Sequence, residues 1–437
     1  MSRNLPSTAA LVVVLAAGLG TAGCSSASDD APAVADTSTP APTGVTLTLW
    51  HNTADSTALL NLYKAYEKES GNTIELVDIP SDTFPMTVQS KWATGDRPDL
   101  LEWHGNRMDA QSLDASHTMV DLSNLTFVAK EGQLAKLSGN LDGKTYAATL
   151  GPLTVFGLFY NKKVLAAAGL QPPRSYADLA AACKTLKSTQ PGVAPIFEAG
   201  GSGWPPAVLA GFDYMGEYNV DSAYANDVVA GKTKLDDAAG PLVTGLKAYQ
   251  ALRAGGCFNS DAPTAKWEDS AKALVEGKAA MLAQGTDTIN LLNADAGGDT
   301  AKVDSTIGFV GLSATKPVAS FSPSPLGTYY VPKSKDAKKQ RAAVDFVEFA
   351  TGKGYQAYVD EAGSVPTISD TTTPKLQGLM QDVQSTIGTA GLTVNSAIPG
   401  FGNFGNEVDK LLAGQQTPEK VGSAMQAYYT QAAAALK

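Results

Sequence analysis

The chain has few of the residues that ligate metals or drive catalysis. Its 437 residues include three histidines and three cysteines, and these do not form a Cys-x-x-Cys, a His-Glu-x-x-His or another spacing typical of a metal site. The Gly-x-Ser-x-Gly turn of serine hydrolases is also absent. The sequence therefore predicts a protein without a metal or another cofactor, and it contains no recognisable enzyme motif.

Positive charge is also in short supply. Lysine and arginine number 33 against 43 aspartates and glutamates, which gives a formal net charge of −10. Nucleic-acid binding relies on basic patches that neutralise phosphates, so this balance argues against a nucleic-acid partner. Internal repeats are absent as well, so nothing predicts a repeat fold.

Long hydrophobic runs are confined to the N-terminus. Arg3 precedes an apolar run at residues 9–20 that is too short to span a bilayer, and the small residues of "TAGC" lead up to Cys24. This segment resembles a bacterial lipobox, so we interpret residues 1–23 as a signal peptide, with cleavage before Cys24 and lipidation of that cysteine. A plain cleaved signal peptide is the alternative. No later segment predicts a transmembrane helix.

Large apolar residues are also missing from the segment that follows. Residues 24–43, which begin with Cys24, are otherwise mostly Ser, Thr, Ala, Pro and Asp, a composition that cannot bury a core, and we expect a flexible tether. Signal peptide, lipidated cysteine and tether predict an extracytoplasmic protein anchored to the outer face of the cell membrane. In that compartment Cys183 and Cys257 are expected to form a disulfide, with two buried free thiols as the alternative.

What is present is an alternation of strand and helix patterns. Residues 45–50 alternate apolar and polar side chains as a strand does, and residues 56–70 repeat apolar residues on one helical face. A strand at 72–79, a helix at 86–95 and a strand at 98–103 follow over short connections. This order predicts an α/β fold with a largely parallel sheet. The length of the chain exceeds one ordinary core, so two lobes are expected.

Two loops follow strands at the sheet edge where ligands of such folds bind. The first contains Trp50, His51, Asn52 and Asp55, and the second begins at Trp103. Sugars pack their C–H faces on aromatic rings and hydrogen-bond through planar polar groups, and both loops supply such side chains. Core packing of the two tryptophans is the alternative.

Histidines in the same loops make an enzyme the rival class. His51 is close in sequence to Asp55, and His104 to Glu102, so such groups could act as acid and base or as zinc ligands. Because no motif supports this hypothesis, we predict a binding protein rather than an enzyme.

Five segments along the chain resemble one bacterial family. They are "ATGDRPDLLEW" at 93–103, "YNKKVLAAAGLQPPRSYADL" at 160–179, "LVEGKAAM" at 274–281, "AAVDFVEFATGKGYQAYVDEAGSVPTISD" at 342–370 and "LLAGQQTPEKVGSAMQ" at 411–426. By these segments the chain is identified as a member of the extracellular solute-binding proteins, family 1, the carbohydrate-binding cluster that includes the maltose-binding protein. The resemblance covers essentially all of residues 44–437.

This resemblance implies a periplasmic-binding-protein type II fold, in which two α/β lobes are joined by a hinge that the chain crosses three times. The crossings are expected at residues 150–155, 308–312 and 363–368. The lobes are then expected to contain residues 44–150 with 313–364, and residues 151–312 with 365–437.

The resemblance also implies a ligand site between the lobes. Trp103, Asn106 and Arg107 correspond to sugar contacts of the first lobe, although the maltose-binding member has an Asp where this chain has Asn106. A surface ion pair of Arg107 with Asp109 or Asp114 is the alternative. In the second lobe the expected ligand residues are Glu198, Trp204, Gln284, Asp287, and Phe401 or Phe404. A solvated loop acid is the alternative for Glu198, and core packing is the alternative for one of the two phenylalanines.

The function implied by the resemblance is sugar capture for an ABC importer. A monomer would bind a carbohydrate, close, and deliver it to the transmembrane subunits of a permease. Two other solutes stay open. A polyamine would suit the acids Asp55, Glu198 and Asp287, and a polyol phosphate would need basic groups, of which only Arg107 is obvious.

Overall fold

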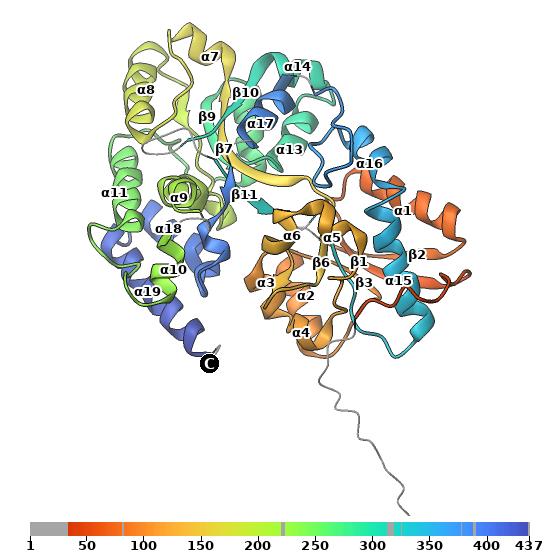
Figure 1. The fold of residues 1–437 in the computed structure, drawn as a ribbon. Helices are drawn as coiled ribbons and strands as arrows, with labels where there is room; N and C mark the ends of the chain where they lie inside the picture. Colours follow the sequence, from red (N-terminus) through yellow and green to blue (C-terminus); the bar gives the residue numbers. More distant parts are fainter. Residues whose placement is uncertain are drawn as a thin grey trace, which may run out of the picture. The chain divides into compact units, whose positions relative to one another are not determined.

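The computed structural model describes residues 34–80, 83–219, 223–312, 319–324, 326–376, 378–387 and 390–435. The predicted signal peptide and Cys24 lie outside the described residues. Within these ranges no helix combines the length and apolar character needed to cross a membrane. The described chain forms two lobes, each built around its own sheet (Figure 1).

The first sheet has the strand order β2-β1-β3-β12-β6. β1 (Thr46–Asn52) lies between β2 (Thr73–Ile79) and β3 (Leu100–Glu102). These strands run parallel because a helix follows β1 and another follows β2, each returning the chain to the same end of the sheet. β12 (Thr328–Tyr330) is antiparallel both to β3 and to β6 (Ala147–Thr149). A strand from late in the chain therefore completes the first lobe.

Helix α1 (Thr57–Ser70) shows why these segments fold as the periodicity predicts. Ser56 caps it by accepting a hydrogen bond from the Leu59 amide at 3.3 Å, and Gly71 ends it in the left-handed conformation, φ 70°. Its buried face packs against α15 (Ala337–Ala350) and α16 (Tyr355–Ala362) beside the sheet (Figure 1). The remaining elements of this lobe are α2 (Phe84–Ala93), α3 (Arg107–Ser112), α4 (Ala115–Thr118), α5 (Thr126–Glu131), α6 (Gln133–Leu137) and the hairpin of β4 (Asn140–Leu141) with β5 (Lys144–Thr145).

The second sheet has the strand order β13-β11-β7-β9-β8, and β10 also pairs with β7. The long strand β7 is antiparallel to β9, β10 and β11, whereas β8 and β9 run parallel. The strands are β7 (Leu153–Asn161), β8 (Ala194–Ile196), β9 (Ala279–Gly285), β10 (Ile307–Val310), β11 (Ser320–Pro323) and β13 (Gly391–Leu392).

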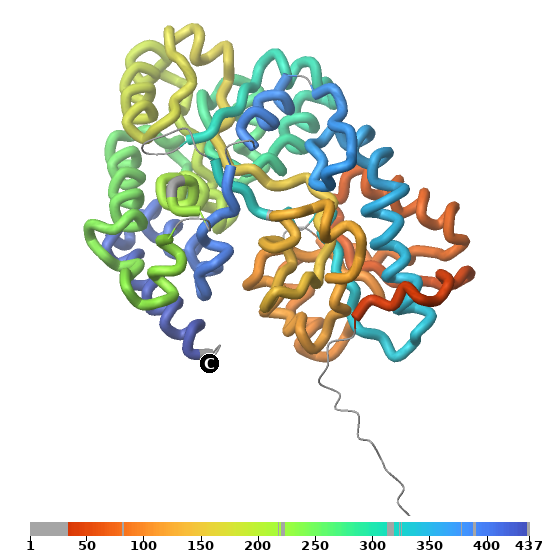
Figure 2. Tube along the Cα trace, viewed as in Figure 1, coloured from red at the N-terminus to blue at the C-terminus, as the bar shows by residue number. Residues whose placement is uncertain are grey.

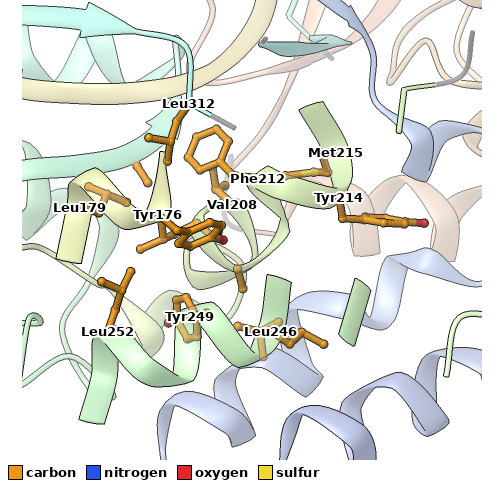
Figure 3. Packing of buried hydrophobic residues seen from close by; sticks show 14 of the residues in the cluster. Tyr176, Leu179, Val208, Phe212, Tyr214, Met215, Leu246, Tyr249, Leu252 and Leu312 are labelled. Atoms are coloured by element: carbon orange, nitrogen blue, oxygen red, sulfur yellow. The ribbon is translucent and has the colours of Figure 1, made fainter. Parts of the chain in front are cut away.

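Helices from two distant parts of the chain cover this second sheet. In Figure 2 the C-terminal segment lies beside the segment around residues 206–254, and α18 and α19 contact α9 and α11. The helices are α7 (Lys162–Ala167), α8 (Tyr176–Thr189), α9 (Pro206–Glu217), α10 (Ala223–Val229), α11 (Pro241–Ala254), α12 (Trp267–Val275), α13 (Thr288–Asp295), α14 (Thr300–Thr306), α17 (Gly378–Ile387), α18 (Phe404–Leu412) and α19 (Pro418–Ala435). Figure 3 shows Tyr176, Val208 and Leu246 among the buried side chains between α8, α9 and α11.

The chain passes between the sheets in segments that only partly coincide with the expected crossings. It leaves β6 after Thr149 and enters β7 at Leu153, within the segment expected for the first crossing. The second crossing, expected at residues 308–312, lies later. β11 pairs with β7 in the second sheet, so the chain returns to the first lobe only between Pro323 and Thr328.

The third crossing is also later than residues 363–368. Ile368 is part of the hydrophobic core of the first lobe, and Ser369 donates a backbone hydrogen bond to the Lys130 carbonyl at 3.1 Å. The next helix, α17, packs on β10 of the second sheet. The crossing therefore follows Ser369, because the extended segment after α16 stays bound to the first lobe.

The described part of the predicted tether is attached to the first lobe. Val34 forms a bridge with Asp121, the Ala35 amide donates to the Asp121 carbonyl at 2.8 Å, and Ala35 is buried. Arg341 also donates to the Thr39 carbonyl at 3.1 Å. The prediction of a flexible tether over 24–43 is therefore wrong for its described residues, because a small residue fits against the lobe and backbone groups find partners there.

A disulfide joins Cys183 of α8 to Cys257, which follows α11. The two cysteines are 74 residues apart in the sequence, and both are buried in the core of the second lobe. The bond ties together two helices of the layer that covers the second sheet.

Candidate ligand-binding surfaces

The loop after β1 is held by a histidine between two carboxylates. His51 is buried; its Nδ1 lies 3.1 Å from Asp55 Oδ2 and its Nε2 lies 2.7 Å from Asp78 Oδ1. Burial alone would lower the pKa of His51, but the hydrogen bonds to Asp55 and Asp78 outweigh it and raise the pKa. His51 therefore ties β1 to β2, and it does not face a ligand surface in this structure.

Asn52 and Trp50 are likewise internal. The Asn52 side-chain oxygen accepts from the Ala54 amide at 2.9 Å, which shapes the turn after β1. Trp50 is buried in the hydrophobic cluster beneath α2, and Lys91 lies over its ring at 4.8 Å from the centroid. The core alternative is the one that the structure shows for Trp50, because both faces of its ring are occupied by protein.

Trp103 is a core residue. Its exposed fraction is 0%. Its ring centroid is 6.0 Å from that of Phe84 and 5.3 Å from that of His104, and its indole N–H donates to the Asp109 carbonyl at 3.4 Å. The expectation that Trp103 stacks on a sugar is wrong for this structure, because the side chain fills the space beneath α2 and α3.

Asn106 and Arg107 begin the helix that follows Trp103. Asn106 caps α3: its side-chain oxygen accepts from the Asp109 amide at 3.0 Å, and its amide group donates to the Asp109 carboxylate. Arg107 pairs with Asp142 at 2.8 Å rather than with Asp109 or Asp114, and 46% of its side chain is exposed. Exposed pairs of this kind contribute little, so a ligand can compete for Arg107.

The second lobe presents an exposed aromatic pair. Trp204 follows the short turn Gly200–Ser202 and is 40% exposed. Its ring meets that of Trp267 edge to face, with the centroids 5.5 Å apart and the planes at 61°. Trp267 stands at the start of α12 and is half-buried. The place of Trp267 beside the exposed Trp204 could not be read from the sequence, because the two residues are brought together only by the tertiary fold.

Polar groups adjoin this pair at the end of β9. The Gln284 side-chain N–H donates to the Pro205 carbonyl at 3.4 Å, next to Trp204, and the Trp267 indole N–H donates to Thr288 Oγ1 at 3.4 Å, next to Asp287. Gln284 Oε1 and Asp287 Oδ1 are buried and find no donor among the described residues. Burial raises the pKa of Asp287 to about 6. Both acceptor atoms lie beneath the surface next to Trp204 and Trp267 rather than on it.

Three further residues of the expected site are internal to the second lobe. Glu198 is buried, and burial, with the nearby Asp409 charge, raises its pKa well above its usual range, so it is not a solvated loop acid. Phe401 stacks on Tyr214, with the centroids 5.4 Å apart and the planes at 12°, and packs against Phe404 at 5.2 Å. The expectation that Phe401 or Phe404 stacks on a ligand is wrong here, because both fill the core.

The second lobe also has a pocket that is separate from the expected site. A pocket of about 460 Å³ lies over the disulfide, between α8 and α11, away from the residues of the expected site. Within the described ranges, no three His, Cys, Asp or Glu side chains are grouped so that they could hold a metal ion.

Comparison with known proteins places the chain in a family. Residues 50–357 match the family described as "Bacterial extracellular solute-binding protein". The "Melibiose/raffinose/stachyose-binding protein MelE" of Bacillus subtilis (strain 168) is 26% identical over 141 residues, which is 32% of this chain and 32% of MelE. The chain thus aligns with about a third of the length of that curated relative.

Solved structures share the fold at lower identity. A chitin oligosaccharide binding protein has a TM-score of 0.74 and 21% identity, over 90% of this chain and 99% of that one. RafE in complex with raffinose has a TM-score of 0.72 and 17% identity, over 89% of this chain and 100% of that one. A sugar transporter protein from Bacillus licheniformis in complex with stachyose has a TM-score of 0.66 and 18% identity, over 89% of this chain and 100% of that one. Because the family match spans well over half of the residues and the two-lobed α/β fold agrees with it, the chain belongs to the bacterial extracellular solute-binding proteins.

Proposed function

We propose that this protein captures an oligosaccharide outside the cell for an ABC importer and delivers it to the permease. The observation that carries the proposal is the exposed Trp204, edge to face with Trp267, near the polar end of β9 and the half-buried Asp287. An aromatic face next to hydrogen-bond acceptors matches the alternating C–H and hydroxyl surfaces of a sugar.

The first lobe would add planar polar contacts. Arg107 is exposed at the start of α3, and Asn106 precedes it. Closure of the lobes on a bound sugar would then combine the Trp204 surface with these groups, and the ligand would shift the equilibrium by its differential affinity for the closed form.

The names of similar proteins indicate which sugars to test first. MelE is named for melibiose, raffinose and stachyose, and solved relatives hold raffinose or stachyose or are named for chitin oligosaccharide. We therefore propose α-galactosides as the first candidates and chitin oligosaccharides as the second. The polyamine alternative has little support, because the Asp55 side chain and Glu198 are buried.

Calorimetry on the purified protein tests the proposal. Titration with raffinose, stachyose, melibiose and a chitin oligosaccharide should give saturable binding of at least one sugar, and chromatography of the same mixtures should show no product. Trp204→Ala should weaken that binding by about 1–3 kcal/mol. Met86→Ala is the matched control, since Met86 is 69% exposed on α2 of the other lobe. Turnover of a sugar, or binding that is indifferent to Trp204→Ala, would contradict the proposal.

We also propose that Cys24 carries a lipid that anchors the protein to the membrane. The support is the lipobox-like "TAGC" that precedes it. Mass spectrometry of the native protein should show an acyl-glyceryl modification on the N-terminal cysteine, and Cys24→Ser should release the protein into the medium. An unmodified N-terminus would contradict the anchor without affecting sugar binding.

A further inference from the structure

A buried glutamate holds the second crossing segment and the loop after β1 at the same time. Glu102 ends β3 and is 0% exposed. Its Oε1 accepts from the Gly327 amide at 2.6 Å, and its Oε2 accepts from the Asn52 amide at 3.0 Å. Gly327 lies in the stretch that brings the chain back from β11 to β12. One carboxyl group therefore links the hinge to the turn that follows β1.

The first and second crossing segments meet at Gly327. Its carbonyl accepts from the Leu150 amide at 2.8 Å, and a Cβ on Gly327 would lie 2.3 Å from the Gly151 carbonyl oxygen. Tyr358 of α16 donates to that same Gly151 carbonyl at 2.6 Å. Because the segments are in direct contact, a displacement of Gly327 is transmitted to residues 150–151.

A series of polar side chains connects Glu102 to solvent. Asp78, at the end of β2, has a side chain that is 75% exposed, and it contacts His51 at 2.7 Å. His51 contacts Asp55 at 3.1 Å, and Asp55 lies near enough to the Glu102 carboxyl for its charge to raise the pKa of Glu102. Protons can thus reach the buried pair of Asp55 and Glu102 from the edge of the sheet.

The groups that face this pair are tyrosines on three elements and His51 on β1. Tyr63 of α1 donates to Asp55 at 2.9 Å and pairs with Tyr329 of β12 at 2.6 Å between the hydroxyl oxygens. Burial raises the pKa of Tyr358 of α16, and the charges of Glu102 and Asp55 raise it further. His51 on β1, with Asp78 on β2 behind it, supplies the positive charge. Burial first, and then the Asp55 charge, raise the pKa of Glu102 well above its usual range.

A single proton held between the carboxyls of Asp55 and Glu102 would give the unpartnered Asp55 oxygen a donor. Asp55 Oδ1 is buried without a partner donor among the described residues, apart from the proton that Glu102 can carry. Two neighbouring carboxylates cannot both be ionised in a dry site without repulsion. Loss of that proton would therefore push Asp55 and Glu102 apart or draw water between them, and both movements act on Gly327 and Asn52.

We propose that Glu102 is a positioning residue of the hinge, and that loss of the proton which it shares with Asp55 shifts the equilibrium between the open and closed arrangements of the lobes. This inference goes beyond the capture of sugar, since it concerns the ligand-free protein and holds for any ligand.

Small-angle X-ray scattering of the ligand-free mature protein, recorded as the pH is raised from acidic to alkaline, tests it. The radius of gyration of the wild type should change through one transition. Asp55→Asn, which removes the second carboxyl and leaves both acceptor oxygens of Glu102 in place, should abolish the transition. Glu102→Gln should also abolish it, although its NH2 group cannot accept a hydrogen bond from one of the two backbone N–H groups that Glu102 binds. Thermal unfolding verifies that each variant is folded, and Asp55→Asn serves if Glu102→Gln does not fold.

Glu131→Gln is the matched control. Glu131 is also buried, and it accepts from the Thr149 amide at 2.9 Å at the first crossing. The Glu131→Gln variant should keep the wild-type transition. A flat wild-type profile, a transition that survives in Glu102→Gln, or one that disappears only in Glu131→Gln would overturn the assignment. Because the measurement contains no sugar, such a failure leaves the calorimetric test of carbohydrate binding unaffected.

Discussion

Replacing Trp103 by alanine separates a core role from a ligand role. The side chain is 0% exposed and packs against Phe84 in the cluster beneath α2. Removing a buried indole costs its transfer free energy and leaves a cavity, and such substitutions cost about 3–5 kcal/mol of stability. Loss of the 3.4 Å hydrogen bond to Asp109 adds to this cost. We therefore expect Trp103→Ala to lower the free energy of unfolding by about 3–5 kcal/mol.

The assay is denaturant unfolding followed by circular dichroism, run beside calorimetry with the sugar that the wild type binds. Trp204→Ala is the complementary variant, because Trp204 is 40% exposed and the opposite outcome is expected for it. It should cost at most about 1 kcal/mol of stability while weakening binding. Trp103→Phe is a milder variant that keeps an aromatic ring if the alanine variant does not fold. Loss of affinity without loss of stability in either Trp103 variant would refute the core assignment and return Trp103 to the ligand surface.

Three further outcomes follow from the structure. Burial raises the pKa of Glu131 to about 8 from the ordinary 4.5. Between these pH values the folded state holds a proton that the unfolded chain releases. The stability that depends on this proton is therefore present below pH 4.5 and is lost as the pH rises towards 8. Glu131→Gln should flatten that fall in thermal unfolding curves, and an unchanged slope would exclude Glu131 as its source. Replacing Cys183 and Cys257 by alanine should cost about 2–5 kcal/mol in urea unfolding, because the bond closes a long loop, and a cost near zero would contradict this account. Asn106→Ala should cost about 1 kcal/mol through loss of the α3 cap, with Asn106→Asp, which retains the cap, as the control; equal losses in the two variants would contradict the capping role.

Local features of the sequence were sufficient for much of the fold. The apolar period of residues 56–70 predicted α1, and the alternation at 45–50 predicted β1. Helices between successive strands predicted a parallel arrangement, which the pairing of β1 with β2 and β3 shows. Each of these signals depends on residues a few positions apart, so a single sequence contains them.

The second crossing could not be placed in the same way. β11 is a short strand, Ser320–Pro323, whose membership of the second sheet depends on pairing with β7 more than 150 residues earlier in the sequence. Neither its length nor its composition carries that information, since strand pairing is a property of two segments. The resemblance therefore predicted the two lobes but placed the return to the first lobe too early.

The sequence by itself determined the order of strands and helices, the family resemblance and the residue types available to a sugar. Tertiary structure alone decided which aromatic residues remain exposed. Trp50 lies in β1, Trp103 follows β3 and Phe401 begins a short 3-10 helix, and all three are buried, whereas Trp204, which lies between a short turn and α9, is exposed. A large aromatic side chain suits a core and a binding surface equally well. Its role depends on whether distant elements cover its faces, and that is set only when the chain has folded.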